Sequence, residues 1–173
     1  MLVLLFCGSI DAQYRPRQFV DISFVTINEF ASNLGLSQTT KQYAHSMIGF
    51  TTIEGIQLNR NTILGIGTGI SFYNEGSLVP LFADIRFDCY NYKKYTVFVY
   101  GDGGFLFKIS NKIEYSKLFI NPGIGLKYDL SRSLTGNFDL GFFVQQGPWR
   151  DSFINLKLGI LFLPQRLWHK TVF

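Results

Sequence analysis

Apolar and polar residues alternate along most of the chain with a period of two. This period is typical of β-strands with two different faces, because successive side chains of a strand point to opposite sides. No segment keeps an apolar period near 3.6, which would indicate an amphipathic helix. Clusters of turn-forming residues divide the alternating part into eight segments, which are 18–30, 43–58, 62–74, 78–90, 95–108, 117–130, 134–146 and 152–163.

The last six segments have faces of an unusual kind. One face of each segment carries apolar residues and no charge, and it includes Ile66, Ile85, Val99, Ile124, Leu140 and Leu158. The other face combines glycine with Asp, Asn, Lys and Arg, whereas the wet face of a soluble sheet carries long polar side chains and few glycines. A small, charged face suits the crowded inside of a narrow cylinder, and an uncharged face suits contact with lipid. We therefore predict an all-β fold: an eight-stranded antiparallel up-and-down transmembrane β-barrel.

The connections between the segments support the same fold. In hydrocarbon every backbone N–H and C=O must be paired, so a spanning sheet has to close on itself. Short turns on one side and longer loops on the other are expected of such barrels, with the short turns in the periplasm. Short connections at 59–61, 91–94 and 131–133 alternate with connections at 31–42, 75–77, 109–116 and 147–151, three of which are longer.

Several residues disturb the pattern. Pro80 and Pro122 fall inside predicted strands and should mark bulges or local breaks, because proline cannot donate a hydrogen bond to a sheet. Glu54 falls in the apolar phase of its segment, five residues before Asn59, and we expect it to reach the membrane interface. The first two segments alternate less cleanly than the rest.

The first twelve residues have the pattern of a secretory signal. An apolar run over 1–7 is followed by small and polar residues, with Ala12 before the expected cut. A signal of this kind normally opens with basic residues, and none precedes Arg15, so the natural start is expected upstream; a buried first strand is the alternative. The prediction is a signal peptide over 1–12 and a barrel domain over 13–173. Cys89 is then the only cysteine, which excludes an intramolecular disulfide.

Composition excludes several other classes of protein. Apolar residues make up 47% and charged residues 16% of the chain, with 18 Phe and 17 Gly. Such a chain is too apolar for disorder and too rich in Gly and Phe for a coiled coil. No stretch of about 18 apolar residues occurs, which excludes a helical membrane protein. The net charge of +4 comes from basic residues spread along the chain. They suit contact with membrane lipid and lipopolysaccharide, and are too diffuse for nucleic acid.

Charged residues on the inward phase predict a polar lumen. Asp84, Arg86 and Asp88 alternate in sign two residues apart and should form a ladder with the arginine between two carboxylates. The predicted polar network of the lumen comprises Asp84, Arg86, Asp88, Asp102, Lys127, Asp129, Asp139 and Lys157. Acidic and basic residues are nearly balanced, whereas an ion-selective pore carries one dominant sign. We therefore expect a closed core of ion pairs, with a narrow, porin-like channel for small solutes as the alternative.

Residues suited to catalysis or to binding metals and cofactors are scarce. His45 and His169 are far apart in sequence, and no His/Cys/Asp cluster has zinc-like spacing. The glycines between Gly65 and Gly69 lie inside a predicted strand, whereas a phosphate-binding loop needs a helix after it. His45 and Ser46 are adjacent in a strand, so they point to opposite faces. We predict no catalytic, metal or cofactor residue and no enzyme; the alternatives are a lipid A deacylase- or acyltransferase-like barrel and, more weakly, a soluble ligand-binding barrel.

Three glycine-rich and aromatic runs carry a family resemblance. The runs 64–74, 78–84 and 120–125 resemble the outer membrane protein β-barrel domains common in Bacteroidetes, and more broadly the chain is similar to OmpA/OmpX-type eight-stranded barrels. The resemblance covers nearly the whole mature chain. It implies a location in the bacterial outer membrane and a barrel fold, without a reaction.

The resemblance also implies a role for the last segment. In such barrels the final strand is recognised by the barrel assembly machinery, which adds it to an exposed sheet edge. The expected assembly signal consists of Leu156, Leu158, Ile160 and Phe162. A structural or surface-interaction role follows, while the extracellular partner stays unidentified.

Overall fold

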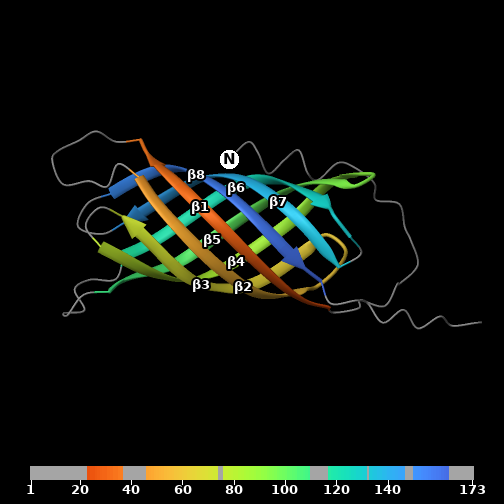
Figure 1. Cartoon of the computed structure of the whole chain (residues 1–173), viewed down its shortest axis with the longest axis horizontal. Coiled ribbons are helices and arrows are strands. Elements are labelled where there is room, and N and C mark those ends of the chain that lie inside the picture. Colours follow the sequence, from red (N-terminus) through yellow and green to blue (C-terminus); the bar gives the residue numbers. More distant parts are fainter. Residues whose placement is uncertain are drawn as a thin grey trace, which may run out of the picture.

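Eight strands form almost all of the part of the chain that the computed structural model describes, which is residues 23–36, 46–73, 76–109, 117–131, 133–146 and 150–163. The strands are β1 (Ser23–Gly35), β2 (Ser46–Gln57), β3 (Thr62–Tyr73), β4 (Gly76–Tyr92), β5 (Tyr95–Ile109), β6 (Lys117–Asp129), β7 (Leu134–Gln146) and β8 (Arg150–Phe162). Each strand pairs antiparallel with the next, and β8 pairs with β1, so the sheet closes into an up-and-down barrel (Figure 1). The predicted fold is confirmed. No helix among the described residues is long and apolar enough to cross a membrane.

The strands are strongly staggered around the barrel. A path of paired residues that starts at Thr26 and crosses every strand once ends at Ser152 on β8. The oxygen of Ser152 accepts a hydrogen bond of 3.0 Å from the backbone N–H of Leu36, well beyond Thr26 along β1. This stagger tilts the strands against the barrel axis. An eight-stranded barrel of this kind encloses a space that side chains can fill.

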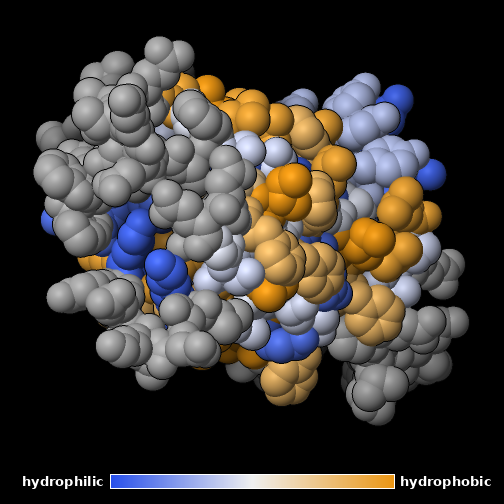
Figure 2. All heavy atoms as spheres, turned by 60° about the vertical axis from the view of Figure 1, so that its left-hand side comes forward, coloured by the Kyte–Doolittle hydropathy of each residue, from blue (hydrophilic) through white to orange (hydrophobic). Residues whose placement is uncertain are grey.

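The inward and outward faces of β3 to β8 agree with the sequence pattern. The predicted apolar face points outward, where Ile66, Ile124 and Leu158 have exposed fractions of 68%, 54% and 60%. The predicted small and charged face points inward, where Arg86 and Asp139 are fully buried. Figure 2 shows apolar side chains gathered over the wall of the barrel. The polarity of a soluble protein is therefore reversed, as the sequence predicted for these strands.

The bounds of β1 differ from the prediction. The sequence placed this strand at 18–30, but it extends to Gly35, and residues 18–22 lie outside the described part of the chain. The connection predicted at 31–42 therefore begins later. Apolar residues occupy both faces of β1, with Ile27 inward and Phe30 outward. A period of two cannot define the inward face of such a strand.

The connections between β2 and β3, β4 and β5, and β6 and β7 lie at one end of the barrel, on the right in Figure 1, which we call the short-turn end. The turn between β4 and β5 is shorter than predicted: Asn91 belongs to β4, and Lys93, with a φ of 55°, forms the turn with Lys94. The ends of β1 and β8 that pair Thr26 with Phe162 also lie at this short-turn end.

The two strand prolines interrupt pairing without shifting it. The pairing of β4 with β3 is interrupted at Pro80, and that of β6 with β7 at Pro122, with the same register before and after each interruption. The predicted local breaks are confirmed, and the predicted bulges do not occur at the prolines. The register instead shifts between Asp88 and Tyr90, where β4 pairs with β5.

Candidate functional site

Arg86 lies at the centre of the lumen among three carboxylates. Its Nη2 donates to Glu29 Oε1 at 2.8 Å, and its Nε donates to Asp84 Oδ1 at 3.0 Å. Asp139 Oδ2 is 3.7 Å from Nη1. All four side chains are fully buried. The planar guanidinium suits this position, because its donors point in several fixed directions at once.

Lys157 on β8 is the second cation of the same network. Its Nζ is 3.2 Å from Glu29 Oε2 and donates to Asp102 Oδ2 at 2.6 Å. Glu29 thus joins the two cations, one oxygen to each. The Nζ also lies 4.6 Å from the ring centroid of Tyr100, where a cation is attracted to the ring face.

Side-chain amides extend the network around the barrel. Asn137 Nδ2 donates to Glu29 Oε1 and to Asp139 Oδ1, each at 3.0 Å. Asn121 Nδ2 donates to Asp102 Oδ2 at 2.9 Å. The network therefore links β1 to all the strands from β4 to β8. Hydrogen bonds from neutral donors help to offset the cost of burying these carboxylates.

The structure separates the eight residues that the sequence assigned to one network. Asp84, Arg86, Asp102, Asp139 and Lys157 belong to the central cluster. Asp88, Lys127 and Asp129 lie nearer the short-turn end and form two separate contacts. Lys127 pairs with Asp88, and Thr135 donates to the exposed Asp129.

The predicted ladder of Asp84, Arg86 and Asp88 is therefore wrong in one part. Arg86 binds Asp84 but turns to Glu29 and Asp139, while Lys127 takes Asp88. The reason is the closed barrel, because other strands supply further partners to an inward side chain, in addition to its neighbours on the same strand.

Glu29 is the residue that the sequence interpretation missed. It lies on β1, where Val25, Ile27 and Glu29 share the inward face. In the sequence, Glu29 follows Val25 and Ile27 on the same face of the strand, so this face looks apolar apart from one glutamate. Its charge could have been recognised as inward only with the register of β1 against β8 and β2.

An aromatic stack lies in the lumen on the side of the longer connections. Phe119 and Phe143 stack with ring centroids 5.0 Å apart. Phe82 contacts Phe119 edge-on at 5.8 Å, and Phe153 contacts Phe143 at 6.0 Å. All four rings are buried. The stack and the charged network lie one after the other along the barrel axis.

The described residues show no arrangement for metal binding or nucleophilic catalysis. None of their His, Cys, Asp and Glu side chains form a group that could hold a metal ion. His45 lies outside the described part of the chain, and Ser46 is exposed at the start of β2. The glycine run of β3 serves packing: a Cβ at Gly67 would overlap the ring of Phe82.

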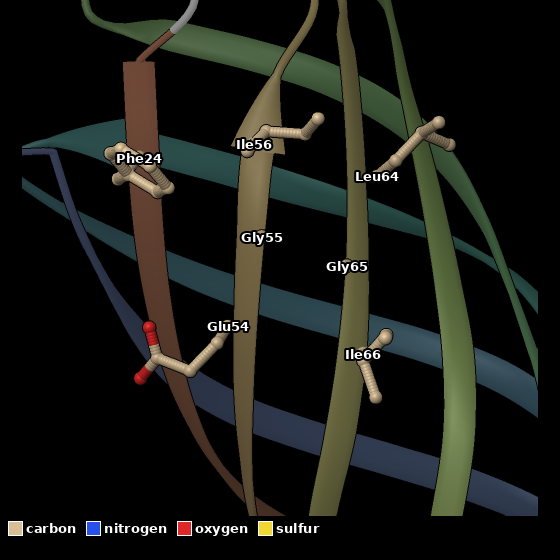
Figure 3. Close-up of a pocket in the computed structure, with 7 residues that line it drawn as sticks. All are labelled: Phe24, Glu54, Gly55, Ile56, Leu64, Gly65 and Ile66. Carbon is tan, nitrogen blue, oxygen red and sulfur yellow. The ribbon is translucent and has the colours of Figure 1, made fainter.

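A groove lies on the outer wall between β1, β2 and β3. It has a volume of about 370 Å³ and is lined by Phe24, Glu54, Gly55, Ile56, Leu64, Gly65 and Ile66 (Figure 3). Glu54 was expected to reach the membrane interface. Its side chain turns sideways to β1, where Thr26 Oγ1 donates to Glu54 Oε2 at 2.8 Å.

Comparisons with known proteins give similarity at the level of fold. No protein-family model matches the chain, and no curated protein matches it in sequence. The crystal structure of Neisserial surface protein A is similar with a TM-score of 0.62 and 10% identity, over 82% of this chain and 97% of that one. The N-terminal β-barrel domain of Pseudomonas aeruginosa OprF is similar with a TM-score of 0.54 and 16% identity, over 81% and 98%. The chain therefore has the fold of the eight-stranded outer-membrane barrels.

Proposed function

We propose that this protein is an integral β-barrel of a bacterial outer membrane, with a closed lumen and a structural or surface-interaction role. The observation that carries the proposal is the set of buried side chains in the interior: the network around Arg86 and the aromatic stack around Phe119 lie one after the other along the barrel axis. A barrel that offers no path through its centre can act through its rigidity in the membrane and through the loops it presents.

The outer wall supports the membrane location. Large apolar side chains cover it. Exposed tyrosines gather at the short-turn end, among them Tyr90, Tyr92, Tyr95 and Tyr128. The rings of Tyr95 and Tyr128 are 5.0 Å apart. Aromatic girdles of this kind mark the interface of membrane barrels with water. The proposed partners are outer-membrane lipid with lipopolysaccharide, and the assembly machinery that would recognise Leu156, Leu158, Ile160 and Phe162.

The narrower resemblance to barrel domains common in Bacteroidetes is part of this proposal. The runs that suggested it fall on β3, β4 and β6, where glycines are packed against inward aromatic rings. A Cβ at Gly123 would lie 2.5 Å from the ring of Tyr100. Such packing is a requirement of narrow barrels in general, so it supports the barrel type.

A small-solute channel is the alternative, and conductance separates the two. The purified protein would be refolded into lipid vesicles, and its folding checked by the shift of the unheated band on a gel. In planar bilayers we expect no steady conductance, while a sixteen-stranded porin in the same membrane should conduct, because its wider barrel leaves an aqueous channel. Steady conductance by the folded chain would contradict the closed lumen.

Orientation and location can be tested in cells. An epitope tag inserted within 110–116 should be labelled on intact cells, because the proposal places that connection outside. A matched tag between Lys93 and Lys94 should be labelled only after the outer membrane is opened. Recovery of the protein in the soluble fraction would contradict the membrane location.

A further inference from the structure

A polar patch interrupts the apolar wall on the outside of β1, β2 and β3. It consists of Thr26, Asn28, Thr52, Glu54 and Thr68, which are neighbours in register: Thr26 pairs with Glu54, and Thr52 pairs with both Asn28 and Thr68. None of the five is buried. Outward residues in the middle of β4 to β8 are apolar or glycine. The patch is therefore a local feature of one side of the barrel.

The patch lies within the region that lipid would cover. Phe24 and Ile56 are outward residues between Glu54 and the short-turn end, and Phe24 is 74% exposed. Figure 3 shows the carboxylate of Glu54 turned away from Phe24 towards the neighbouring strand. It does not extend to the end of the barrel, where water would solvate it. Polar and ionisable groups facing hydrocarbon are unfavourable and usually mark a contact.

Two cross-strand hydrogen bonds organise the patch and leave one donor and one acceptor unused. Thr26 Oγ1 donates to Glu54 Oε2, and Thr52 Oγ1 donates to Asn28 Oδ1, each at 2.8 Å. Within the described part of the chain, Glu54 Oε1 accepts no hydrogen bond and Asn28 Nδ2 donates none. The patch thus presents an amide donor beside a carboxylate acceptor in fixed positions.

The donor and the acceptor lie at nearly the same depth. The row of paired residues that starts at Thr26 goes once around the barrel and reaches β1 again beside Leu36, which is nearer to the longer connections. Each step of the row from one strand to the next, including the step from β1 to β2, therefore leads towards the longer connections. Glu54, paired with Thr26, is therefore raised towards the level of Asn28. Two copies inserted in the same direction are related by an axis along the membrane normal, which keeps each residue at its own depth. Asn28 of one copy can then face Glu54 of the other.

We propose that this face binds a second copy of the chain, forming a two-fold dimer in the plane of the membrane. The Asn28 amide of each copy donates to the Glu54 carboxylate of the other, so the unused donor and acceptor are satisfied twice. A two-fold interface needs such a self-complementary patch. The outer groove beside Glu54, with Gly55 and Gly65 at its floor, receives apolar side chains at the edge of the contact. The inference rests on the proposed membrane location.

Cysteine crosslinking in lipid vesicles tests the dimer. Thr52→Cys, at the centre of the patch, would be made in a chain carrying Cys7→Ser and Cys89→Ser. The matched control is Ile124→Cys on the outward face of β6. At a high ratio of lipid to protein, oxidation should give a disulfide-linked dimer for the Thr52 variant and little for the control. Equal crosslinking at both positions in the folded protein would overturn the dimer.

Removal of the polar pair provides the second arm of the test. Asn28→Leu with Glu54→Leu should reduce crosslinking through Thr52→Cys about tenfold, because the reciprocal hydrogen bonds are lost. The folded gel band should persist, since the change makes the wall more compatible with lipid. Glu54→Gln keeps a side-chain acceptor and should retain most crosslinking. Undiminished crosslinking of the double variant would overturn the proposed contact.

The outcomes for the dimer and for the membrane location are distinct. A parent chain that folds in vesicles, yet crosslinks through Thr52→Cys no better than through the control, overturns the dimer alone. A parent chain that gives no folded band in lipid overturns the membrane location and the dimer with it.

Discussion

Arg86 Nη2 and Glu29 Oε1 meet at 2.8 Å in the middle of the lumen, although the two residues are 57 positions apart in sequence. Neither side chain is exposed. Glu29 also contacts Lys157 on the last strand, so it connects β1 to both β4 and β8. The pair therefore ties the first strand to the opposite wall and to the strand that closes the barrel.

Removal of the arginine should destabilise the barrel strongly. Arg86→Ala leaves Glu29, Asp84 and Asp139 without their shared cation, and breaking a buried charge network of this kind typically costs about 3–5 kcal/mol. The midpoint of unfolding in urea, followed by the folded gel band in vesicles, should fall. Lys94→Ala in an exposed turn is the control and should leave the midpoint unchanged.

A second substitution can show that the loss is due to charge. Asp84→Asn in the Arg86→Ala background removes a carboxylate whose ion pair among the described residues is with Arg86 alone, and it should recover part of the lost stability. Equal stability of Arg86→Ala and the parent would show that the lumen charges are solvated by water and are not maintained by pairing.

Adjacent glycines on β5 provide a matched test of interior packing. A Cβ at Gly104 would overlap the carbonyl oxygen of Leu81 and lie 2.5 Å from Cα of Phe82, so backbone would have to move. A Cβ at Gly103 would lie 3.8 Å from the nearest atom, the carbonyl oxygen of Phe119. Gly104→Ala should cost about 1–3 kcal/mol of unfolding free energy, the range typical of overpacking. Gly103→Ala should be nearly neutral, and the reverse order would mean that the inward face is assigned wrongly.

An arginine on the outer wall should destabilise the barrel more in the middle of the membrane than near its surface. Ile124→Arg, in the middle of β6, should reduce the free energy of unfolding in vesicles by about 2–4 kcal/mol, and Leu140→Arg on the paired position of β7 should do the same. Leu130→Arg, at the short-turn end of the same wall, should cost about 0–1 kcal/mol. Equal tolerance at all three positions would contradict contact of this wall with lipid.

The end of the last strand should control insertion. Phe162 points outward and pairs with Thr26 on β1 and Leu134 on β7, so it lies at the closure of the barrel. Phe162→Asp should abolish the folded band in cell envelopes, whereas deletion of 167–173 should be tolerated. Loss of insertion on deleting this tail alone would transfer the assembly signal to the terminal residues.

The sequence by itself determined the number of strands, their antiparallel order and the faces of β3 to β8. It could do so because these properties depend on local periodicity: Ile66 and Ile124 alternate with small or polar residues that the opposite face requires. The prolines were also informative locally, since a residue without an N–H cannot donate a hydrogen bond to a neighbouring strand.

Tertiary structure decided which charges meet. Arg86 pairs with Glu29 and Asp139 from other strands, and Asp88 pairs with Lys127. Closure and stagger of the barrel bring these residues together, and no periodicity in the sequence indicates such pairs. The inward and outward faces of β1 and β2 also depended on the tertiary structure. Their apolar residues occupy both faces, so the depth and direction of Glu29 and Glu54 followed from register against β8 and β3 and could not be obtained from alternation alone.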